Sequence, residues 1–392
     1  MIIDLYSQAI FDNPYPYLEQ IRAQGPVVRH DELGAWMVTS DKLIRQIMMK
    51  PDVFSMEGSP IQMLFGREAF ISIDDRAVHN AMRGAWAEAF RRESLDRLIP
   101  MINDTIDMLW TPVLERLRRG ETVDVAADFC RDLPAYVIAS MLGVDKSDRP
   151  NIVRWSDEMG AAVISKPMAD GSRSPEWVRG EEAKAELARF LRNKIEAVRK
   201  KPDNGLISQL VNAEVGATMS ENSLIENCRQ LLFGGNETTA KWLSHIFVVL
   251  AKHPQVRHEV ARNPELIPAA AEEVMRWEPV VHRSHRVVAT DDAMIGDQKV
   301  SKGDLVILFL GAANRDPERH PDPQRFDIHR EQKSHLGFGV GLHSCLGVNL
   351  ARQEVRLAFE RILADLPDYE LVDQPRYGGL GLRGPSDVMV AA

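Results

Sequence analysis

The sequence predicts a mainly α-helical protein with a small strand-rich lobe. Three observations support this prediction. Long stretches place apolar residues at helical spacing, two shorter regions alternate like strands, and the 392 residues contain neither a low-complexity linker nor an internal repeat. We therefore expect a single domain over residues 1–392, although length alone would favour two or three.

Helical apolar spacing defines the expected helices. They cover residues 14–24, 76–95, 98–118, 125–142 and 178–200, and the longest begins at Ser220 or Ser223 and ends near Lys252. Ser223 and Glu226 form a possible capping box at the start of this longest helix. About thirty residues at about 1.5 Å rise reach about 45 Å, which is enough to cross a domain.

The expected strands lie towards both ends of the chain. Residues 27–39 predict a hairpin around Gly34, residues 292–310 alternate like strands, and the tail 369–392 shows strand and turn patterns. We expect a strand-rich lobe formed by residues of about 25–60 and 285–310 together with the C-terminal strands.

Composition narrows the class of protein. A content of 44% hydrophobic and 27% charged residues is typical of a globular protein, and the formal net charge of −9 disfavours a nucleic-acid partner. Three widely spaced cysteines without a CxxC pair argue against a disulfide framework or a zinc ribbon. No apolar run has the length of a membrane span, and the first residues do not resemble a signal peptide. We expect a cytoplasmic protein without a membrane anchor.

The most informative segment is FGVGLHSCLG, residues 338–347. Gly339 and Gly341 can adopt backbone conformations closed to other residues and let the chain approach a flat macrocycle. Gly347 has no side chain to collide with such a ring, and Phe338 can shield the sulfur of Cys345 from water. A thiolate presented in this way is an axial ligand for haem iron. The alternative is an ordinary small, buried cysteine.

This segment resembles the haem-binding signature of the cytochrome P-450 superfamily and matches all its fixed positions. The resemblance implies the fold of that family, with haem b (iron protoporphyrin IX) between the long central helix and the helix after the cysteine loop. It implies that Cys345 is the proximal iron ligand and that His343 bonds a haem propionate. A surface loop histidine is the alternative for His343.

A second segment, GGNETT at residues 234–239, lies within the longest expected helix. Glycine inside a helix costs about 1 kcal/mol relative to alanine, so two glycines indicate close approach or a local opening of the helix. By resemblance, Glu237 is the acid and Thr238 the alcohol of the family's oxygen-activation pair, which delivers the protons that release one oxygen atom as water. Gly234 departs from the alanine often found there. A kinked helix with surface Thr and Glu is the alternative.

The haem propionates require cations and hydrogen-bond donors. By resemblance, His79 and Arg83 match the family's His-x-x-x-Arg on a helix, and Arg286 matches an arginine at the start of a strand. Arg283 or His285 could replace Arg286 if the alignment slips. The family's Asp-Pro-Pro before the histidine is replaced here by residues 75–77, Asp-Arg-Ala, which makes the shape of that loop uncertain.

Glu273 and Arg276 lie three residues apart on one expected helix face, where an ordinary surface ion pair is the plain interpretation. The resemblance implies instead a buried structural pair, with Arg325 as its third partner. For the substrate pocket the resemblance indicates Phe65, Gly234, Gly235, Val281 and His282. These residues are mostly apolar and predict an apolar substrate of small to medium size. A solvent-facing or internally bonded histidine is the alternative for His282.

These inferences predict a haem-thiolate monooxygenase that inserts one oxygen atom from O2 into an apolar C–H or C=C bond. The sequence has no GxGxxG between a strand and a helix, so electrons are expected from an external ferredoxin-type partner and its reductase. Arg91, Arg92, Arg352 and Arg356 form a possible docking patch, or else a solvated helix face. A peroxide-driven peroxygenase and a gas sensor or ligand-binding protein without turnover are the competing functions, and the Glu237–Thr238 pair argues against both.

Overall fold

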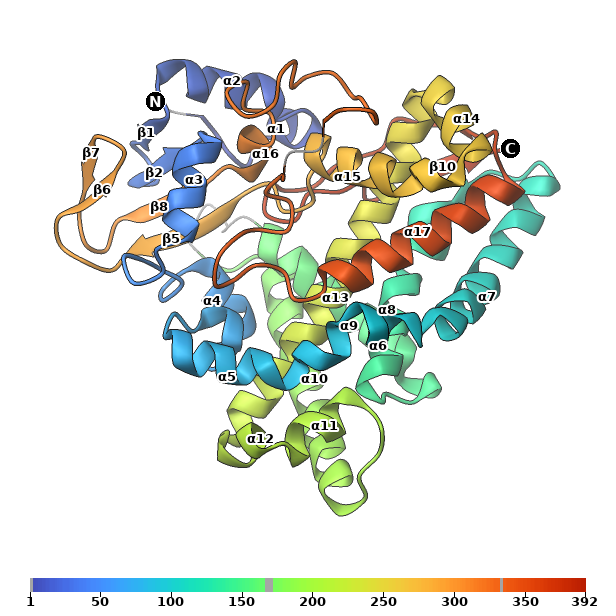
Figure 1. Cartoon of the computed structure of the whole chain (residues 1–392), viewed down its shortest axis with the longest axis horizontal. Coiled ribbons are helices and arrows are strands. Elements are labelled where there is room, and N and C mark those ends of the chain that lie inside the picture. The colour runs from blue at the N-terminus through green and yellow to red at the C-terminus, as the bar shows by residue number, and fades with distance from the viewer. Residues whose placement is uncertain (1–2, 166–171, 332–333) are drawn as a thin grey trace.

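The computed structural model describes residues 3–165, 172–331 and 334–392. Figure 1 shows most strands gathered at one side of the molecule and a larger assembly of helices on the other. The mainly α-helical prediction with a small strand-rich lobe is therefore confirmed.

The elements follow the chain as a mixture of long and short helices. The α-helices are α1 (Gln8–Asp12), α2 (Tyr15–Gln24), α3 (Asp41–Met48), α4 (Pro60–Phe65), α5 (Arg76–Ala87), α6 (Arg92–Asp96), α7 (Ile99–Arg118), α8 (Asp132–Leu142), α9 (Arg149–Ile164), α10 (Pro175–Lys200), α11 (Leu206–Asn212), α12 (Glu214–Thr218), α13 (Glu221–Lys252), α14 (Pro254–Arg262), α15 (Ile267–Trp277), α16 (Leu310–Ala313) and α17 (Val348–Asp365). The strands are β1 (Val27–His30), β2 (Ala35–Val38), β3 (Phe54–Ser55), β4 (Val123–Asp124), β5 (Ser284–Val288), β6 (Ala293–Ile295), β7 (Gln298–Val300), β8 (Leu305–Leu308), β9 (Glu370–Leu371) and β10 (Met389–Ala391).

The main sheet has the order β1-β2-β8-β5-β3, in which only the β2–β8 pair is parallel. Successive residues of a strand face opposite sides of a sheet. Accordingly Val38 and Leu308 pack with α3 on one side, whereas Met37 and Ile307 pack with α1 and α2 on the other. The expected hairpin at 27–39 is confirmed, with Val27 paired to Val38.

The C-terminal strands do not belong to that lobe. β10 pairs with β4 and β9 in a separate three-stranded sheet beside the helical part, as Figure 1 shows. The expectation that the tail completes the strand-rich lobe is therefore wrong. A strand pattern gives no information on which distant segment will supply the hydrogen-bonding partner.

The longest expected helix is α13, which is continuous from Glu221 to Lys252. Its N-cap is Ser220, whose Oγ accepts a hydrogen bond from the Ser223 backbone N–H at 2.9 Å. Ser223 therefore lies inside the helix, and Glu226 accepts from the Glu68 backbone N–H instead of closing a capping box. The two glycines do not open this helix.

The expected helix at 76–95 is divided. It consists of α5, a 3-10 turn (Glu88–Phe90) and α6. Arg91 has an extended conformation, with φ −72° and ψ 151°, and this residue turns the chain between the two helices. The 125–142 prediction is divided in a similar way into a π turn (Ala126–Cys130) and α8.

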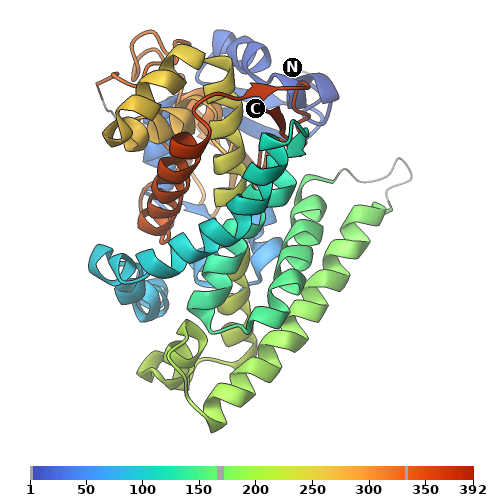
Figure 2. The same ribbon diagram turned by 90° about the vertical axis from the view of Figure 1, so that its right-hand side faces the viewer.

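The long helices α9 and α10 both pack against α13. Figure 2 shows these two helices side by side. The largest apolar core fills the space among α7, α8, α10, α13, α15 and α17. Among the described residues, no helix is long and apolar enough to cross a membrane.

Candidate functional site

The loop before α17 is fixed by glycines and by backbone hydrogen bonds. Gly339 and Gly341 have φ of 65° and 77°, the left-handed region that favours glycine. A Cβ on Gly341 would lie 2.7 Å from the Met48 carbonyl oxygen, so this glycine also allows α3 to approach. The Cys345 N–H donates to the Phe338 carbonyl oxygen at 2.9 Å, which closes the loop.

Cys345 lies two residues before Gly347, the N-cap of α17. Its side chain is accessible to solvent although protein surrounds it on most sides, so the thiol faces a recess within the molecule. Burial raises the pKa of the Cys345 thiol, while the Gly347 backbone N–H and the charges of Arg83 and Arg352 act in the opposite direction. A neutral thiol is therefore favoured unless a cation binds the sulfur. Cys130 and Cys228 are fully buried.

Phe338 is held by aromatic and cationic neighbours. Its ring packs edge-on against Trp242 of α13, with 5.5 Å between the ring centroids. The guanidinium of Arg352 lies over the same ring at 5.1 Å. The residue thus connects α13, the cysteine loop and α17.

Two histidines meet beside this loop. The His79 and His343 rings are nearly perpendicular, with centroids 5.1 Å apart. His79 Nε2 and His343 Nδ1 are buried and have no hydrogen-bond partner. Burial lowers the pKa of both imidazoles. Asn80 Oδ1 lies 3.3 Å from His79 Nδ1 and Asp74 Oδ1 lies 3.0 Å from His343 Nε2, so these nitrogens carry the single proton of each neutral ring. The unpartnered nitrogens can donate to a bound group only when the rings are protonated, which a bound carboxylate favours.

Two arginines complete the set predicted from the sequence. Arg83 Nη1 donates to the Ser344 carbonyl oxygen at 2.6 Å, directly beside the cysteine. Arg286 lies on β5, is 2% exposed, and donates to the His285 carbonyl oxygen at 2.7 Å. Burial lowers the pKa of Arg286 to about 10. The structure therefore brings a thiol, two imidazoles and two guanidinium groups together around one recess.

Sequence reasoning missed Asp74. Its Oδ1 lies 3.0 Å from His343 Nε2, and its Oδ2 accepts from Ser55 Oγ at 2.5 Å and from the Met56 N–H at 2.9 Å. The sequence feature that could have indicated this residue is the pair of acids, Asp74 and Asp75, just before the helix that carries His79. The second acid, Asp75, caps α5 by accepting from the Val78 N–H at 2.9 Å, so the helix begins normally without the family's prolines.

The middle of α13 presents one accessible stripe on an otherwise buried helix. Gly234 is exposed and Thr238 is half-buried, four residues further along the same face. A Cβ on Gly234 would meet nothing within 4 Å, whereas on Gly235 it would lie 3.1 Å from Ile138 of α8. The two glycines differ: Gly234 borders open space, and we assign Gly235 to helix packing, contrary to its expected place in the substrate pocket.

Glu237 and Thr238 point to different neighbours. Thr238 Oγ1 donates to the Gly234 carbonyl oxygen at 2.8 Å. Glu237 is buried, forms an ion pair with Lys241 Nζ at 2.6 Å, and faces α9, where a Cβ on Gly160 would lie 3.1 Å from its Oε1. The acid therefore lies between α13 and α9, and the alcohol lies on the accessible stripe.

A second carboxyl that the sequence did not reveal interacts with Glu237. Asp157 is on α9, one helical turn before Gly160, and its Oδ2 lies 3.6 Å from Arg131 Nη1. Burial raises the pKa of Asp157 to about 6, and the Glu237 charge acts in the same direction. Nothing in the local sequence distinguishes this aspartate from a surface residue.

The predicted substrate contacts divide into two groups. Phe65 of α4 is buried and meets Phe233 of α13 edge-on, with centroids 5.7 Å apart, and Val281 is partly buried against the core of the strand-rich lobe. His282 is fully buried, with its ring over the Gly311 backbone and its Nε2 3.5 Å from the Tyr15 hydroxyl. The prediction that His282 contacts substrate is wrong, because its ring is enclosed between the N-terminal helices and α16.

The Glu273–Arg276 pair is buried and bidentate, as expected from the resemblance. The two N–O contacts are both 2.7 Å and each residue is 2% exposed. The third side chain of the cluster is Arg330, whose Nε lies 3.3 Å from Glu273 Oε1. Arg325 contributes only its carbonyl oxygen, which accepts from Arg276, while its side chain is 67% exposed. The prediction of Arg325 as the third side chain is therefore wrong.

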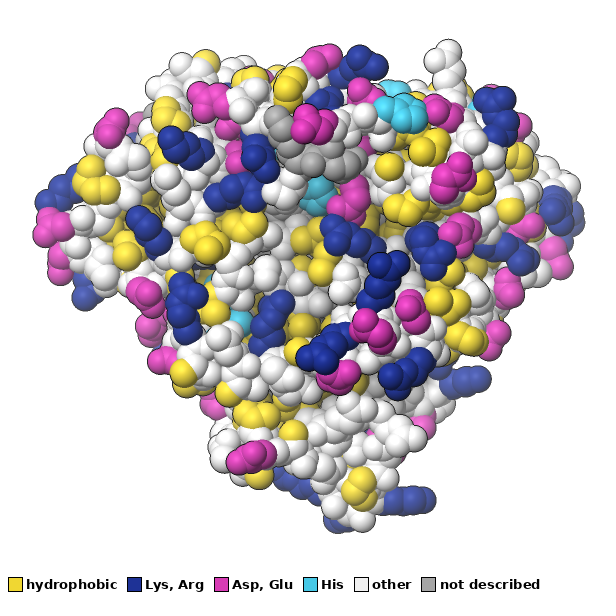
Figure 3. Space-filling view, viewed as in Figure 1, with side chains coloured by type: hydrophobic (Ala, Val, Ile, Leu, Met, Phe, Trp, Pro, Cys, Tyr) yellow, Lys and Arg dark blue, Asp and Glu magenta, His cyan; other side chains and the backbone are white. Residues whose placement is uncertain are grey.

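The expected basic patch is largely paired with acids. Arg91 bonds Glu88, Arg356 bonds Glu360, and Arg352 makes two hydrogen bonds with Glu272. Arg92 is exposed and joins no ion pair among the described residues. Figure 3 shows Lys and Arg side chains over and around α17 with Asp and Glu among them, so this face is mixed rather than uniformly basic.

Comparison with known proteins identifies the family. The profile of the family "Cytochrome P450" matches residues 12–366. The chain is 32% identical over 367 residues to "Putative cytochrome P450 YjiB" of Bacillus subtilis (strain 168), covering 92% of this chain and 89% of that protein. It is 31% identical over 383 residues to "Cyclomarin C epoxidase CymV" of Salinispora arenicola, covering 96% and 95%.

A solved structure shares the whole architecture. The structure titled "Crystal Structure of P450BioI in complex with hexadec-9Z-enoic acid ligated Acyl Carrier Protein" superposes with a TM-score of 0.88 at 27% identity, covering 98% of this chain and 99% of that one. The chain belongs to the cytochrome P450 family. It is a monooxygenase that uses haem b and O2 and receives electrons from a redox partner.

The residues present fit haem b. The macrocycle carries two carboxylates and an iron that needs an axial donor. The recess offers the accessible thiol of Cys345, the unpartnered His79 Nε2 and His343 Nδ1, and the arginines Arg83 and Arg286. This donor set matches the chemistry of the group at both its iron and its propionates.

The raised pKa of Asp157 generates a prediction about stability. An acid whose pKa is raised by folding stabilises the protein below its unfolded pKa, and this contribution is lost as the pH rises through the folded value of about 6. Asp157→Asn should therefore have a higher Tm than the wild type at neutral pH, with a difference that shrinks as the pH falls below that value. Thermal unfolding across this range is the measurement. Glu182→Gln, on the exposed face of α10, is the matched control, and a constant Asp157→Asn difference at all pH values would contradict the assignment.

Proposed function

We propose that this monooxygenase binds haem through Cys345, delivers protons through Glu237 and Thr238, and oxidises an apolar organic substrate of small to medium size. We also propose a cytoplasmic location and a ferredoxin-type electron donor with its reductase. The supporting observation is the position of Cys345, which is accessible at the N-terminus of α17 in a loop fixed by two glycines of positive φ.

The thiol loop is suited to holding a sulfur anion beside a cation. The Gly347 N–H and the N-terminus of α17 favour negative charge on the sulfur, as do Arg83 and Arg352. Phe338 shields one side, because Trp242 and Arg352 fix its ring. When haem is bound, it supplies the metal centre at which O2 is activated.

Glu237 and Thr238 have separate roles in the proposed proton delivery. The Thr238 hydroxyl donates its own proton to the Gly234 carbonyl oxygen, which leaves its lone pairs available on the accessible stripe. Glu237 is held by Lys241 and borders Asp157, which is 40% exposed, so a carboxyl in contact with solvent lies next to the buried acid. This arrangement supports proton delivery in which the Thr238 hydroxyl accepts a hydrogen bond on the accessible stripe and Glu237 is the ionisable acid.

The accessible stripe on α13 supports an apolar substrate. Gly234 leaves open space beside the helix, and the neighbouring Phe233 of α13 packs edge-on against Phe65 of α4. Pockets for small molecules are lined mainly by apolar and aromatic side chains, with few polar groups to set orientation. In this chain Thr238 is the polar side chain on the stripe.

Replacement of the proposed ligand tests the first role. In Cys345→His, the reduced CO complex should lose the red-shifted Soret band of a thiolate-bound haem, because imidazole donates less electron density than sulfur. Cys228→Ala is the matched control, since this cysteine is fully buried in α13, and it should retain the band. A red-shifted band that survives in Cys345→His would show that another residue holds the iron.

Removal of one hydroxyl tests proton delivery. Thr238→Ala should bind haem normally but divert reducing power to hydrogen peroxide, lowering the fraction of NADH that yields product by about tenfold, because no hydroxyl remains on the stripe to hold the proton-carrying group in place. Product and peroxide are measured together with a surrogate ferredoxin system. Thr218→Ala removes an equivalent hydroxyl, which bonds the Val215 carbonyl oxygen at 2.8 Å away from the site, and should leave coupling unchanged. Unchanged coupling in Thr238→Ala would remove its proposed role.

Electron delivery is proposed to occur at the face around Arg92. Arg92 begins α6 in the stretch that follows the His79 helix, and it is the exposed arginine of the expected patch without an ion-pair partner among the described residues. An unpaired guanidinium can meet a carboxylate of an acidic protein without first breaking an existing pair.

Arg92→Ala should therefore raise the KM for a surrogate ferredoxin severalfold and leave kcat nearly unchanged, because rim charges act mainly on association. The ferredoxin dependence of substrate-driven NADH consumption measures this effect. Arg179→Ala, which removes an exposed arginine from α10, is the control and should behave as the wild type. Equal KM values for the two variants would exclude Arg92 from the docking surface.

A further inference from the structure

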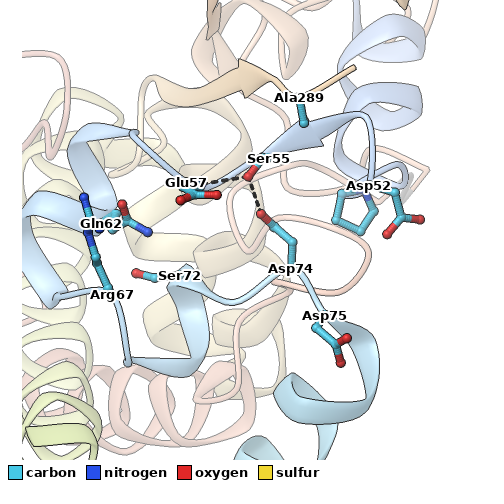
Figure 4. Close-up of a pocket in the computed structure, with 10 residues that line it drawn as sticks. Asp52, Ser55, Glu57, Gln62, Arg67, Ser72, Asp74, Asp75 and Ala289 are labelled. Carbon is cyan, nitrogen blue, oxygen red and sulfur yellow. Dashed lines mark hydrogen bonds between the residues drawn. The ribbon is translucent and has the colours of Figure 1, made fainter. Parts of the chain in front are cut away.

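A cavity lies on the strand side of the molecule and adjoins the cysteine recess through Asp74, which contacts His343. It has a volume of about 410 Å³ and is bordered by β3, α4 and the residues before α5. Figure 4 shows its polar wall. Four carboxylates, of Asp52, Glu57, Asp74 and Asp75, line the cavity together with one guanidinium, of Arg67. Four negative charges and one positive charge give a formal sum of −3 and favour a cationic ligand.

Two of these carboxylates already have protein partners, and two do not. Asp75 caps α5, and Asp74 accepts hydrogen bonds from Ser55 and Met56. The carboxylates of Asp52 and Glu57 are exposed and take part in no hydrogen bond or ion pair among the described residues. Their charge is available to a ligand.

Ser72 provides an independent indication of a ligand. Its residue is only 5% exposed, and its Oγ is enclosed and has no hydrogen-bond partner. Figure 4 shows this hydroxyl pointing towards the side of the cavity formed by Gln62 and Arg67. A buried hydroxyl without a partner costs free energy that a bound donor group recovers.

The spacing of these groups argues for an extended ligand rather than a metal ion. Within the described residues, no group of three or more His, Cys, Asp or Glu side chains could hold a metal ion. In Figure 4, Glu57 and Ser72 lie on one side of the cavity and Asp52 lies on the other. The volume of about 410 Å³ falls within the usual range for small-molecule sites.

We propose that this cavity binds a linear aliphatic diamine as its dication. One ammonium group donates to the Glu57 carboxylate and the Ser72 hydroxyl, and the other donates to the Asp52 carboxylate. Gln62 Oε1, which accepts from the Gly58 N–H at 3.0 Å, has a second lone pair for the first ammonium group. Asp74 adds a negative charge beside the Ser55 side of the wall.

Calorimetric titration of the holoenzyme with putrescine tests the proposal, at about 0.15 M salt so that weak surface attraction is screened. Butylamine, with one ammonium group, and magnesium chloride, with a compact dication, are the comparison ligands. We expect one putrescine per chain, bound at least about tenfold more tightly than either comparison ligand, a difference of about 1.4 kcal/mol.

Variants locate the site. Asp52→Asn/Glu57→Gln should weaken putrescine binding by about tenfold or more, and Ser72→Ala by severalfold, because each removes an acceptor of an ammonium group. The double variant Asp104→Asn/Glu115→Gln makes the same change in net charge with two exposed acids of α7 and should bind as the wild type.

Three results would overturn the proposal: no saturable binding of putrescine, magnesium binding of equal strength, or equal weakening in the two double variants. Each variant should keep the red-shifted Soret band of the reduced CO complex. A failure of putrescine binding with this band intact is then distinguishable from a failure of the haem assignment. Because Asp52 and Glu57 are exposed and have no protein partner, their replacement preserves the fold, and thermal unfolding of each variant verifies this.

Discussion

The buried ion pair between Glu273 and Arg276 is the interaction on which the position of the cysteine loop depends. Two charges at 2% exposure are costly to desolvate, and the bidentate geometry with further hydrogen bonds repays that cost. Arg276 also donates to the carbonyl oxygens of Asn314, Pro323 and Arg325. The Asn314 side chain in turn accepts from the Leu336 N–H at 2.7 Å, where the cysteine loop begins. Removing one partner of such a buried pair costs roughly 3–5 kcal/mol of folding free energy. The pair and the hydrogen bonds that connect it to Asn314 and Leu336 therefore hold α15 and the cysteine loop in a fixed relative position.

The accessible stripe on α13 depends on a difference in burial between neighbouring residues of this helix. α13 is buried along most of its length, and tertiary packing, not local propensity, keeps it continuous through its two glycines. Gly235 lets α8 come close, whereas Gly234 and Thr238 remain accessible. Because i and i+4 share a helix face while i+1 points about 100° away, Glu237 is directed to α9 and Thr238 lies on the accessible stripe with Gly234. α13 thus places Glu237 among polar contacts with α9 and leaves Thr238 on the accessible stripe.

Local patterns in the sequence predicted what depends on local structure. The cysteine loop, the hairpin and most long helices follow from spacing and turn residues, whereas the burial of the Glu273–Arg276 pair was implied by the family resemblance and not by its spacing. The failures concern contacts between distant segments. His282 was expected at the substrate from the family resemblance, and no sequence pattern reveals Tyr15, its partner 267 residues away. Arg330 and Arg325 are both arginines near the same segment, and only the folded chain shows which guanidinium reaches Glu273. Asp157 approaches Glu237 only through the packing of α9 on α13, which periodicity does not encode.

The segment from α4 to the start of α5 separates two environments of opposite chemistry. On one side Phe65 packs against Phe233 of α13, and both rings are buried in the apolar core. On the other side Gln62 and Ser72, from the same segment, border the acidic cavity. A carboxylate such as Asp74 is tolerated between them because three donors satisfy its oxygens and because burial alone would otherwise penalise its charge. Asp74 thus joins the wall of the cavity to the histidine side of the cysteine loop through hydrogen bonds to Ser55, Met56 and His343.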